Sequence, residues 1–221
     1  MHIIVTAGPT REHLDPVRFV SNRSTGKMGY AIAAEAQLRG HTVHLISGPV
    51  AISVPTGVAA TQIVSAQDML DAVMAHLGEA DVLIMCAAVA DWRPREVSSR
   101  KLKKDVMSGT LHLERTVDIL AAVKTKRRPN QLIIGFAAET EDVLLYAREK
   151  LERKGLDLIV ANDVSRSDAG FGVDTNVVTL LDREGGVHEL ALMPKREVAR
   201  IILGWAEARR DSHVIPGDEP L

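Results

Sequence analysis

The sequence predicts an α/β protein, with a mostly parallel β-sheet flanked by helices, an excursion from that sheet, and a C-terminal β-hairpin followed by a helix. Short apolar runs rich in β-branched residues alternate with segments of helical periodicity from residue 2 to residue 161. These runs are apolar at nearly every position, which is typical of parallel strands that are covered on both faces. The chain has 221 residues, of which 46% are hydrophobic, so one domain with a substantial core is expected.

Five strands and three helices account for this alternation, in the βαβ order of a Rossmann-like sheet. The strands are expected at residues 2–6, 42–47, 81–87, 131–136 and 157–161. The helices are expected at residues 26–39, 66–77 and 141–154. Gly40 and Gly155 are stop signals for the first and third helices, and Ser65 and Thr140 are suited to cap the second and third.

The last third of the chain changes character. Residues 176–182 and 187–192 are expected to form a hairpin around a turn at residues 184–186, and Pro194 opens an amphipathic helix that ends at Arg210. Residues 92–115 interrupt the βαβ pattern and predict a flap, whose strands carry Lys101 and Lys103 on one side. We therefore expect a single domain at residues 1–210 and a disordered tail at residues 211–221.

Composition excludes several function classes. The net charge is −2, with 27 basic and 29 acidic residues, so no global positive field favours nucleic acid or a membrane surface as a partner. The longest apolar run, at residues 82–90, is too short to span a bilayer, and no basic leader precedes the first strand. A cytoplasmic protein is expected. The single cysteine, Cys86, excludes an internal disulfide, and the eight histidines lack metal-ligand spacing.

The strand at residues 81–87 is followed by small residues and by the carboxylate of Asp91, with a lysine run at residues 101–104 close behind. Ligands of parallel α/β sheets bind outside the carboxyl ends of the strands, so Asp91 is placed at a ligand crevice. Nearby lysines supply the positive charge that a nucleoside triphosphate requires. The alternative is that the run is a solvated charge cluster on an exposed edge.

The first strand-to-helix connection argues against a dehydrogenase. A dinucleotide fingerprint places G-x-G-x-x-G directly between strand and helix, whereas here a long polar excursion separates Gly8 from Gly26 and Gly29. The stretch is not a Walker A loop either. The helix start at Gly26 still offers free amides to an anion, with Asn22 and Ser24 as further donors. Alternatively, these glycines only allow close packing of the helix on the sheet.

Tyr146-x-x-x-Lys150 has the spacing of the acid/base pair of short-chain dehydrogenases, but the glycine-rich turn and a partner serine are missing. Lys150 and Lys154 lie one helical turn apart, so both are able to reach one polyphosphate. As an ordinary solvated helix face, the two lysines would have no such role.

Six motifs together resemble phosphopantothenoylcysteine synthetase over roughly residues 2–205. The motifs are Gly8-Pro-Thr-Arg-Glu-x-x-Asp-Pro-Val-Arg18, Ser21-Asn-x-Ser-x-Gly-Lys-Met-Gly29, Ala87-Ala-Val-Ala-Asp91, Lys101-x-Lys-Lys104, Gly135-Phe-Ala-Ala-Glu-Thr140 and Asp157-Leu-Ile-Val-Ala-Asn-Asp163. In bacteria this enzyme is often one half of a bifunctional protein with a flavin decarboxylase. The resemblance implies a ligase of coenzyme A biosynthesis that joins 4′-phosphopantothenate to L-cysteine, with CTP as co-substrate and Mg²⁺ carried by the triphosphate.

The resemblance also implies roles for particular residues. Asn22 and Lys101 would be catalytic: Asn22 would orient the phosphopantothenate carboxylate or the acyl intermediate, and Lys101 would stabilise charge at the α-phosphate. Lys150 and Lys154 would bind the triphosphate. The nucleoside pocket would comprise Gly8, Met85, Cys86, Ala87, Asp91, Thr116, Val117, Asp118, Ile119 and Phe136, and the substrate pocket would add Ser24, Gly26 and Ala88 to Asn22. Thr116-Val117 stands where the family usually has Asn-Pro, so the cytosine contact is a departure from the pattern.

The resemblance further implies a homodimer, with the flap near the subunit interface, and a flavin decarboxylase as partner or fused half. Two alternatives stay open: an ATP-using form of the same ligase, and a non-catalytic CTP-binding module that regulates a decarboxylase.

Overall fold

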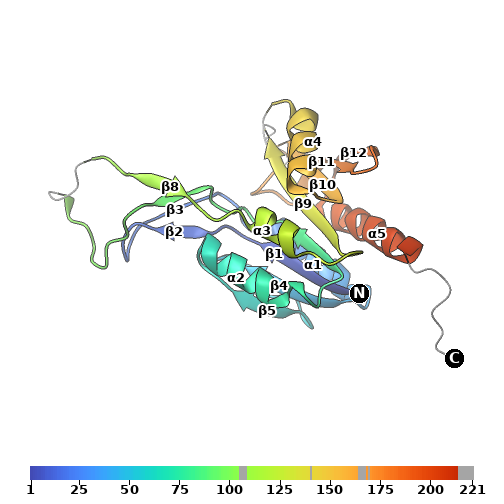
Figure 1. The fold of residues 1–221 in the computed structure, drawn as a ribbon, viewed down its shortest axis with the longest axis horizontal. Helices are drawn as coiled ribbons and strands as arrows, with labels where there is room; N and C mark the ends of the chain where they lie inside the picture. Colours follow the sequence, from blue (N-terminus) through green and yellow to red (C-terminus); the bar gives the residue numbers. More distant parts are fainter. Residues whose placement is uncertain (105–108, 140, 164–167, 169, 214–221) are drawn as a thin grey trace.

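A computed structural model describes residues 1–104, 109–139, 141–163, 168 and 170–213. Its main sheet has eight strands in the order β12-β11-β10-β9-β6-β1-β4-β5 (Figure 1). The strands are β1 His2–Ala7, β4 Thr42–Ser47, β5 Ala59–Gln62, β6 Val82–Met85, β9 Leu132–Glu139, β10 Leu158–Asp163, β11 Thr175–Asp182 and β12 Val187–Pro194. Neighbours from β10 to β5 pair in parallel, and β11 and β12 are antiparallel additions. The predicted α/β fold class is thereby confirmed.

Helices cover both faces of the sheet and create two separate cores. The helices are α1 Lys27–Leu38, α2 Ala66–Leu77, α3 Ile119–Lys126, α4 Val143–Lys154 and α5 Lys195–His213. Alternate strand residues such as Val5, Ile84 and Ile134 pack with α1 and α5 on one face. Their neighbours in sequence, such as Leu83 and Ile133, pack with α2, α3 and α4 on the other. We call these the α1/α5 face and the α4 face; they follow from the period of two along each strand.

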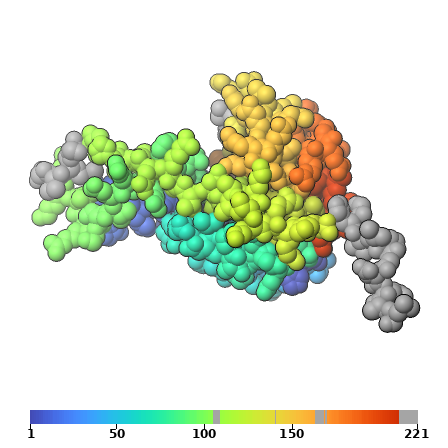
Figure 2. All heavy atoms as spheres, viewed as in Figure 1, coloured from blue at the N-terminus to red at the C-terminus, as the bar shows by residue number. Residues whose placement is uncertain are grey.

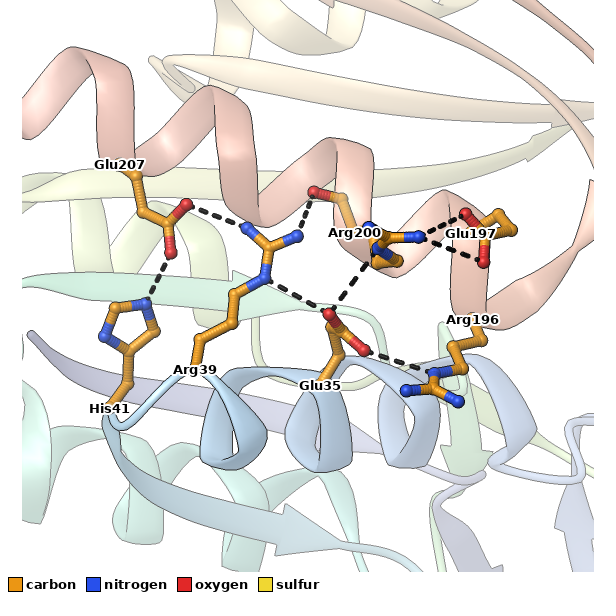
Figure 3. Close-up of polar contacts among 7 residues, drawn as sticks. All are labelled: Glu35, Arg39, His41, Arg196, Glu197, Arg200 and Glu207. Atoms are coloured by element: carbon orange, nitrogen blue, oxygen red, sulfur yellow. Dashed lines mark hydrogen bonds and ion pairs between the residues drawn. The ribbon is translucent and has the colours of Figure 1, made fainter.

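The two helices of the α1/α5 face are joined by an ion-pair network (Figure 3). Glu35 is buried on α1, and its carboxylate lies 3.2 Å from Arg39 Nε and 3.3 Å from Arg196 Nε of α5. Glu207 of α5 accepts from Arg39 at 2.8 Å and contacts the His41 ring at 2.8 Å. Because a buried carboxylate is costly unless it is paired, this network fixes how α5 lies on α1.

Element boundaries differ from expectation at several points. The third predicted helix begins at Val143 instead of residue 141, because Asp142 has left-handed backbone (φ 45°) and precedes it as the N-cap. Its predicted cap, Thr140, lies outside the described residues. Strand β6 ends at Met85 instead of residue 87. Helix α5 continues to His213, so the predicted tail begins at least three residues too early, and residues 214–221 are not described.

Other boundaries agree with the sequence. Ser65 caps α2 through a reciprocal capping box with Asp68, and Gly155 ends α4 at φ 63°. The short elements β5 and α3 were not predicted. Only Ile119 and Val123 of α3 are buried, and β5 is largely exposed, so neither carries a strong hydrophobic period.

Two small antiparallel ribbons extend from the body: the hairpin of β2 Arg11–His13 with β3 Phe19–Ser21, and the pair of β7 Trp92–Pro94 with β8 Leu113–Arg115 (Figure 1). Residues 92–115, between and including β7 and β8, form the flap. In the space-filling view this part stands out from the body as an arm (Figure 2). Within the described residues, no helix is long and apolar enough to cross a membrane.

The flap differs from expectation in one respect. Its strands do not carry Lys101 and Lys103, which lie outside regular secondary structure. The reason is local: the N–H and C=O of the intervening Leu102 bind side chains of the β2–β3 connection instead of a neighbouring strand.

Candidate functional site

A cleft of about 1060 Å³ lies over the carboxyl ends of β6, β9 and β10. The strand order reverses between β1 and β6, and such switch points are where open α/β sheets bind ligands. The cleft extends over the carboxyl ends of the strands from one face of the sheet to the other. Lys27 and Lys195 lie toward its α1/α5 end, and Asp118, Lys150 and Lys154 toward its α4 end.

The cleft brings together most of the residues that the sequence singled out. Its walls include Asn22, Ser24, Gly26, Met85, Cys86, Ala87, Ala88, Asp91, Thr116, Val117, Asp118, Ile119, Phe136, Lys150 and Lys154. Gly8 and Lys101 do not line it. Tyr146 does not line it either and is half exposed, so the structure does not place a tyrosine–lysine pair in the cleft.

Gly8 lies behind the cleft wall. Its carbonyl accepts the Ala88 N–H at 2.9 Å, and its φ of 72° places it in the left-handed region. An added Cβ would come within 2.9 Å of the Val50 side chain and 3.0 Å of the Gly48 carbonyl. Gly8 therefore holds the backbone at Ala88 in place.

Lys101 is exposed on the flap, outside the cleft of its own chain. It borders a second, shallower hollow of about 730 Å³ together with Arg18, Leu102, Lys103, Lys104 and Gly109. Within the described residues, the chain therefore keeps the lysine run apart from Lys150 and Lys154.

The start of α1 is shaped by Gly26 and Asn22. Gly26 has φ 81°, and its N–H donates to Ser24 Oγ at 3.3 Å. Asn22 Nδ2 donates to the carbonyls of Ala88 and Val89, each at 3.1 Å. Because both partners are carbonyl acceptors, the amide atom that faces them is the nitrogen, and both of its hydrogens are used. The expectation that Asn22 donates to the acyl group is therefore corrected: the atom it offers a ligand is Oδ1, an acceptor.

The α4 end carries cations that are already oriented. Lys150 Nζ donates to the Phe136 carbonyl at 2.8 Å, and burial lowers the pKa of Lys150, although Glu139 and Asp91 oppose this. Lys154 forms a close ion pair with Asp118. Burial alone would raise the pKa of Asp118, but the Lys154 contact, the Ala121 N–H and the charge of Arg153 together lower it.

Thr116 occupies the position of the departure from the family pattern. Its hydroxyl donates to the Ala90 carbonyl at 2.6 Å, and its N–H donates to the Asp91 carbonyl at 3.0 Å. These bonds tie the end of β8 to the backbone that precedes and includes Asp91. Thr116 thus supports the part of the cleft wall that includes Asp91.

Sequence reasoning pointed to the start of α1 at Gly26 but missed Lys195 of α5. This side chain is buried, and its Nζ lies 2.7–2.9 Å from the carbonyls of Gly170, Val173 and Thr175 and from Asn176 Oδ1. Burial lowers the pKa of Lys195 to about 8. The sequence signal was its position after Pro194, which indicated a helix start but not that this lysine points inward.

Two side chains near the start of α1 also hold the loop at residues 170–174, which precedes β11 and borders the cleft. Lys27 Nζ donates to Asp174 Oδ1 at 2.7 Å, and the Thr25 hydroxyl donates to the Phe171 carbonyl at 2.5 Å. Together with Lys195, they join this loop to α1 and α5.

Two further polar groups line the cleft without a clear chemical assignment. The Asn162 side-chain oxygen is buried and has no hydrogen-bond partner within the described part of the chain. Burial raises the pKa of the Cys86 thiol to about 12, so its thiolate is scarce at neutral pH. This agrees with a packed cysteine. No cluster of three or more metal-ligating His, Cys, Asp or Glu side chains occurs among the residues described.

Residues 1–209 match the family model of the DNA/pantothenate metabolism flavoprotein C-terminal domain. The chain belongs to this family. It is 51% identical over 203 residues to the coenzyme A biosynthesis bifunctional protein CoaBC of Bacillus subtilis, covering 91% of the chain and 50% of that protein. It is 43% identical over 214 residues to the Escherichia coli K12 protein of the same name, covering 96% and 52%. The chain thus spans about half the length of these curated relatives.

Solved structures of this family share the fold. The crystal structure of the C-terminal domain of a CoaBC protein is 46% identical, covers 96% of both chains and superposes with a TM-score of 0.82. The family member from Streptococcus pneumoniae is 26% identical, covers 94% of this chain and 99% of that one, and has a TM-score of 0.80.

Proposed function

We propose that the chain is a phosphopantothenate–cysteine ligase that uses CTP and forms an acyl-cytidylate intermediate. The observation that carries the proposal is the cleft: motifs far apart in the sequence, from Asn22 to Lys154, converge on it in a member of this family. Its relatives are named as coenzyme A biosynthesis proteins, which agrees with this activity.

In the first step, a carboxylate oxygen of 4′-phosphopantothenate attacks the α-phosphorus of CTP. A P–O bond forms, the bond to the β-phosphate oxygen breaks, and pyrophosphate leaves with that electron pair. This chemistry depends on positioning and on neutralisation of charge. Lys150 and Lys154, oriented by the Phe136 carbonyl and by Asp118, are suited to hold the triphosphate. With no protein cluster of acidic or histidine ligands among the described residues, Mg²⁺ would be bound chiefly by the triphosphate itself.

In the second step, the neutral amine of L-cysteine attacks the acyl carbon. A C–N bond forms, the C–O bond to the phosphate breaks, CMP leaves, and the nitrogen gives up a proton to the released phosphate or to water. Asn22 Oδ1 is suited to accept an N–H of the amine, because the Asn22 nitrogen is already bound to two backbone carbonyls. Ser24, Gly26 and Ala88 would complete the wall around the acyl group.

We further propose that the enzyme is a homodimer in which Lys101 reaches the cleft of the second copy. Lys101 is outside its own cleft, on a flap that extends away from the body (Figure 2). The flap and the neighbouring hairpin expose large apolar side chains, which favours burial against another subunit. These side chains are Val17, Phe19, Trp92, Val97, Leu111 and Leu113.

Three finer points belong to the same proposal. The chain would work in the cytoplasm, where its substrates are made. Its natural partner, or fused half, would be a flavin decarboxylase that consumes the product, as the bifunctional names of the relatives suggest. CTP rather than ATP would be the nucleotide.

A pyrophosphate-release assay tests the proposal. The chain is incubated with 4′-phosphopantothenate, L-cysteine, Mg²⁺ and either CTP or ATP. We expect release that requires phosphopantothenate and is fastest with CTP. Release of pyrophosphate in the ATP reaction but not in the CTP reaction would show that ATP is the nucleotide. If neither nucleotide gives release although CTP binds, the chain is the non-catalytic regulatory module.

A further inference from the structure

Asp15 is a buried carboxylate in the connection between β2 and β3, two strands that form one of the ribbons extending from the body (Figure 1). Its Oδ1 accepts the N–H groups of Val17 and Arg18, each at 2.8 Å. Its Oδ2 accepts Arg18 Nε at 3.0 Å and Nη2 at 2.5 Å, and the Leu102 N–H at 3.1 Å. Both oxygens are therefore fully used by donors, and Asp15 is not placed to act as a base.

Asp15 and Arg18 hold Leu102 from both sides of its peptide unit. While Asp15 accepts the Leu102 N–H, Arg18 Nη2 donates to the Leu102 carbonyl at 3.0 Å. A second tie between the same two segments joins the Ser98 N–H to the Leu14 carbonyl at 3.0 Å. The flap thus acquires a fixed point at Leu102, one residue after Lys101, although that stretch belongs to no strand.

Charge explains why a carboxylate serves at this point. Arg18, together with the backbone donors, lowers the pKa of Asp15 well below its ordinary value, so the group is ionised at neutral pH. The Asp15 charge is matched by Arg18, so this carboxylate does not offset the positive charge of the exposed Lys101, Lys103 and Lys104 that border the hollow.

We propose that Asp15 is a positioning residue for Lys101: by holding the backbone at Leu102, it sets where the Lys101 ammonium lies when the flap meets its target. This inference rests on the proposed catalytic role of Lys101. Misplacement of a reacting group by about 1 Å costs on the order of 10²-fold in rate, so loss of this tie has a measurable effect on chemistry.

The test is a double-mutant cycle between Asp15→Asn and Lys101→Gln in the full chain. Single-turnover formation of the acyl-cytidylate, CTP affinity and thermal unfolding are measured for wild type, each single variant and the double variant. In Asp15→Asn, one carboxylate oxygen becomes an NH₂ group, which cannot accept a hydrogen bond, and the other becomes a neutral amide oxygen. The contacts that hold Leu102 and Arg18 are therefore broken or weakened. We expect its rate to fall about 10²-fold, with CTP affinity unchanged because the cleft is intact. In the Lys101→Gln background the same substitution should cost less than about threefold, because a positioning residue has nothing left to position.

Glu114→Gln is the matched control. It removes a carboxylate from the exposed Arg93–Glu114 pair on the β7–β8 ribbon without touching Leu102, and it should leave the rate unchanged. Trypsin provides a local readout: cleavage after Lys101, Lys103 and Lys104 should be faster in Asp15→Asn than in the control. If Asp15→Asn does not fold, Asp15→Glu replaces it in the same cycle, since it keeps the charge but displaces the carboxylate by one methylene.

The outcomes separate the two proposals. A Lys101→Gln variant with the wild-type rate would refute the role of Lys101 itself. If Lys101→Gln is slow but Asp15→Asn is fast, the positioning role is wrong and the proposed function stands. Equal losses from Asp15→Asn in both backgrounds would also overturn the positioning role, because Asp15 would then act independently of Lys101.

Discussion

Replacing Lys195 by methionine should destabilise the protein markedly, although the residue lies at the start of a helix where lysine is ordinarily exposed. Lys195→Met keeps an unbranched side chain as far as the ε carbon but removes the ammonium that serves four acceptors. The contacts to the Gly170 carbonyl and to Asn176 Oδ1 are buried, and those to Val173 and Thr175 are partly buried and able to rehydrate. A buried acceptor left without a donor costs about 1–3 kcal/mol.

Two such acceptors give a loss of about 2–6 kcal/mol in the free energy of unfolding. Part of this is offset, because burial disfavours the ammonium and lowers the pKa of Lys195 to about 8. We therefore expect a loss of about 2–4 kcal/mol, or a fall in Tm of roughly 4–16 °C for a chain of this size.

Urea unfolding followed by circular dichroism measures this loss, with Lys126→Met on the exposed end of α3 as the control. The control should change stability by less than about 0.5 kcal/mol. A Lys195→Met protein within about 1 kcal/mol of wild type would show that the loop at residues 170–174 and the start of β11 do not depend on this ammonium.

Three further predictions concern Asn22 in the cleft, Tyr146 on α4 and His44 on β4. Asn22→Ala should fold normally yet slow amide formation by about 10²-fold, with acyl-cytidylate accumulating in quenched samples; wild-type turnover would contradict the role of Asn22. Tyr146→Phe should retain activity, because Tyr146 is outside the cleft, and a collapse of steady-state turnover would revive the dehydrogenase-like hypothesis. His44 has a lowered pKa because of burial and the neighbouring His76, so the unfolded chain binds more protons than the native state below about pH 6.5 and stability falls as the pH is lowered. His44→Gln should flatten that slope in unfolding experiments at pH 5–7, and an unchanged slope would exclude His44 as its source.

The buried strands and the capped helices were predictable because their signals are local. An unbroken apolar run such as Val82–Met85 has few structural alternatives, and Ser65 and Gly155 mark helix ends through their own backbone chemistry. The same holds for the residues of the cleft that follow strands, since carboxyl ends of parallel strands share one edge.

The parts that were missed depend on contacts between distant segments. Lys195 is buried and Lys27 is held at the cleft because both bind carbonyls of the loop at residues 170–174, and a sequence pattern does not reveal the partners of a lone lysine. The lysine run was predicted in strands because of its alternation, but Asp15, 87 residues away from Leu102, determines the backbone there. Tertiary hydrogen bonds overrode local propensity in both cases.

Because the cleft extends from one face of the sheet to the other, its two ends are supported by different hydrophobic cores. Lys150 and Lys154 lie on α4, which packs on the core that contains Leu83 and Ile133. Lys27 and Lys195 instead belong to α1 and α5, which pack on the core that contains Val5 and Ile84. The sheet separates the two, so repacking one core leaves the supports of the other end in place. The α4 end and the α1/α5 end of the cleft can then be altered by separate sets of substitutions, and the effects of such sets on stability and on ligand affinity should add.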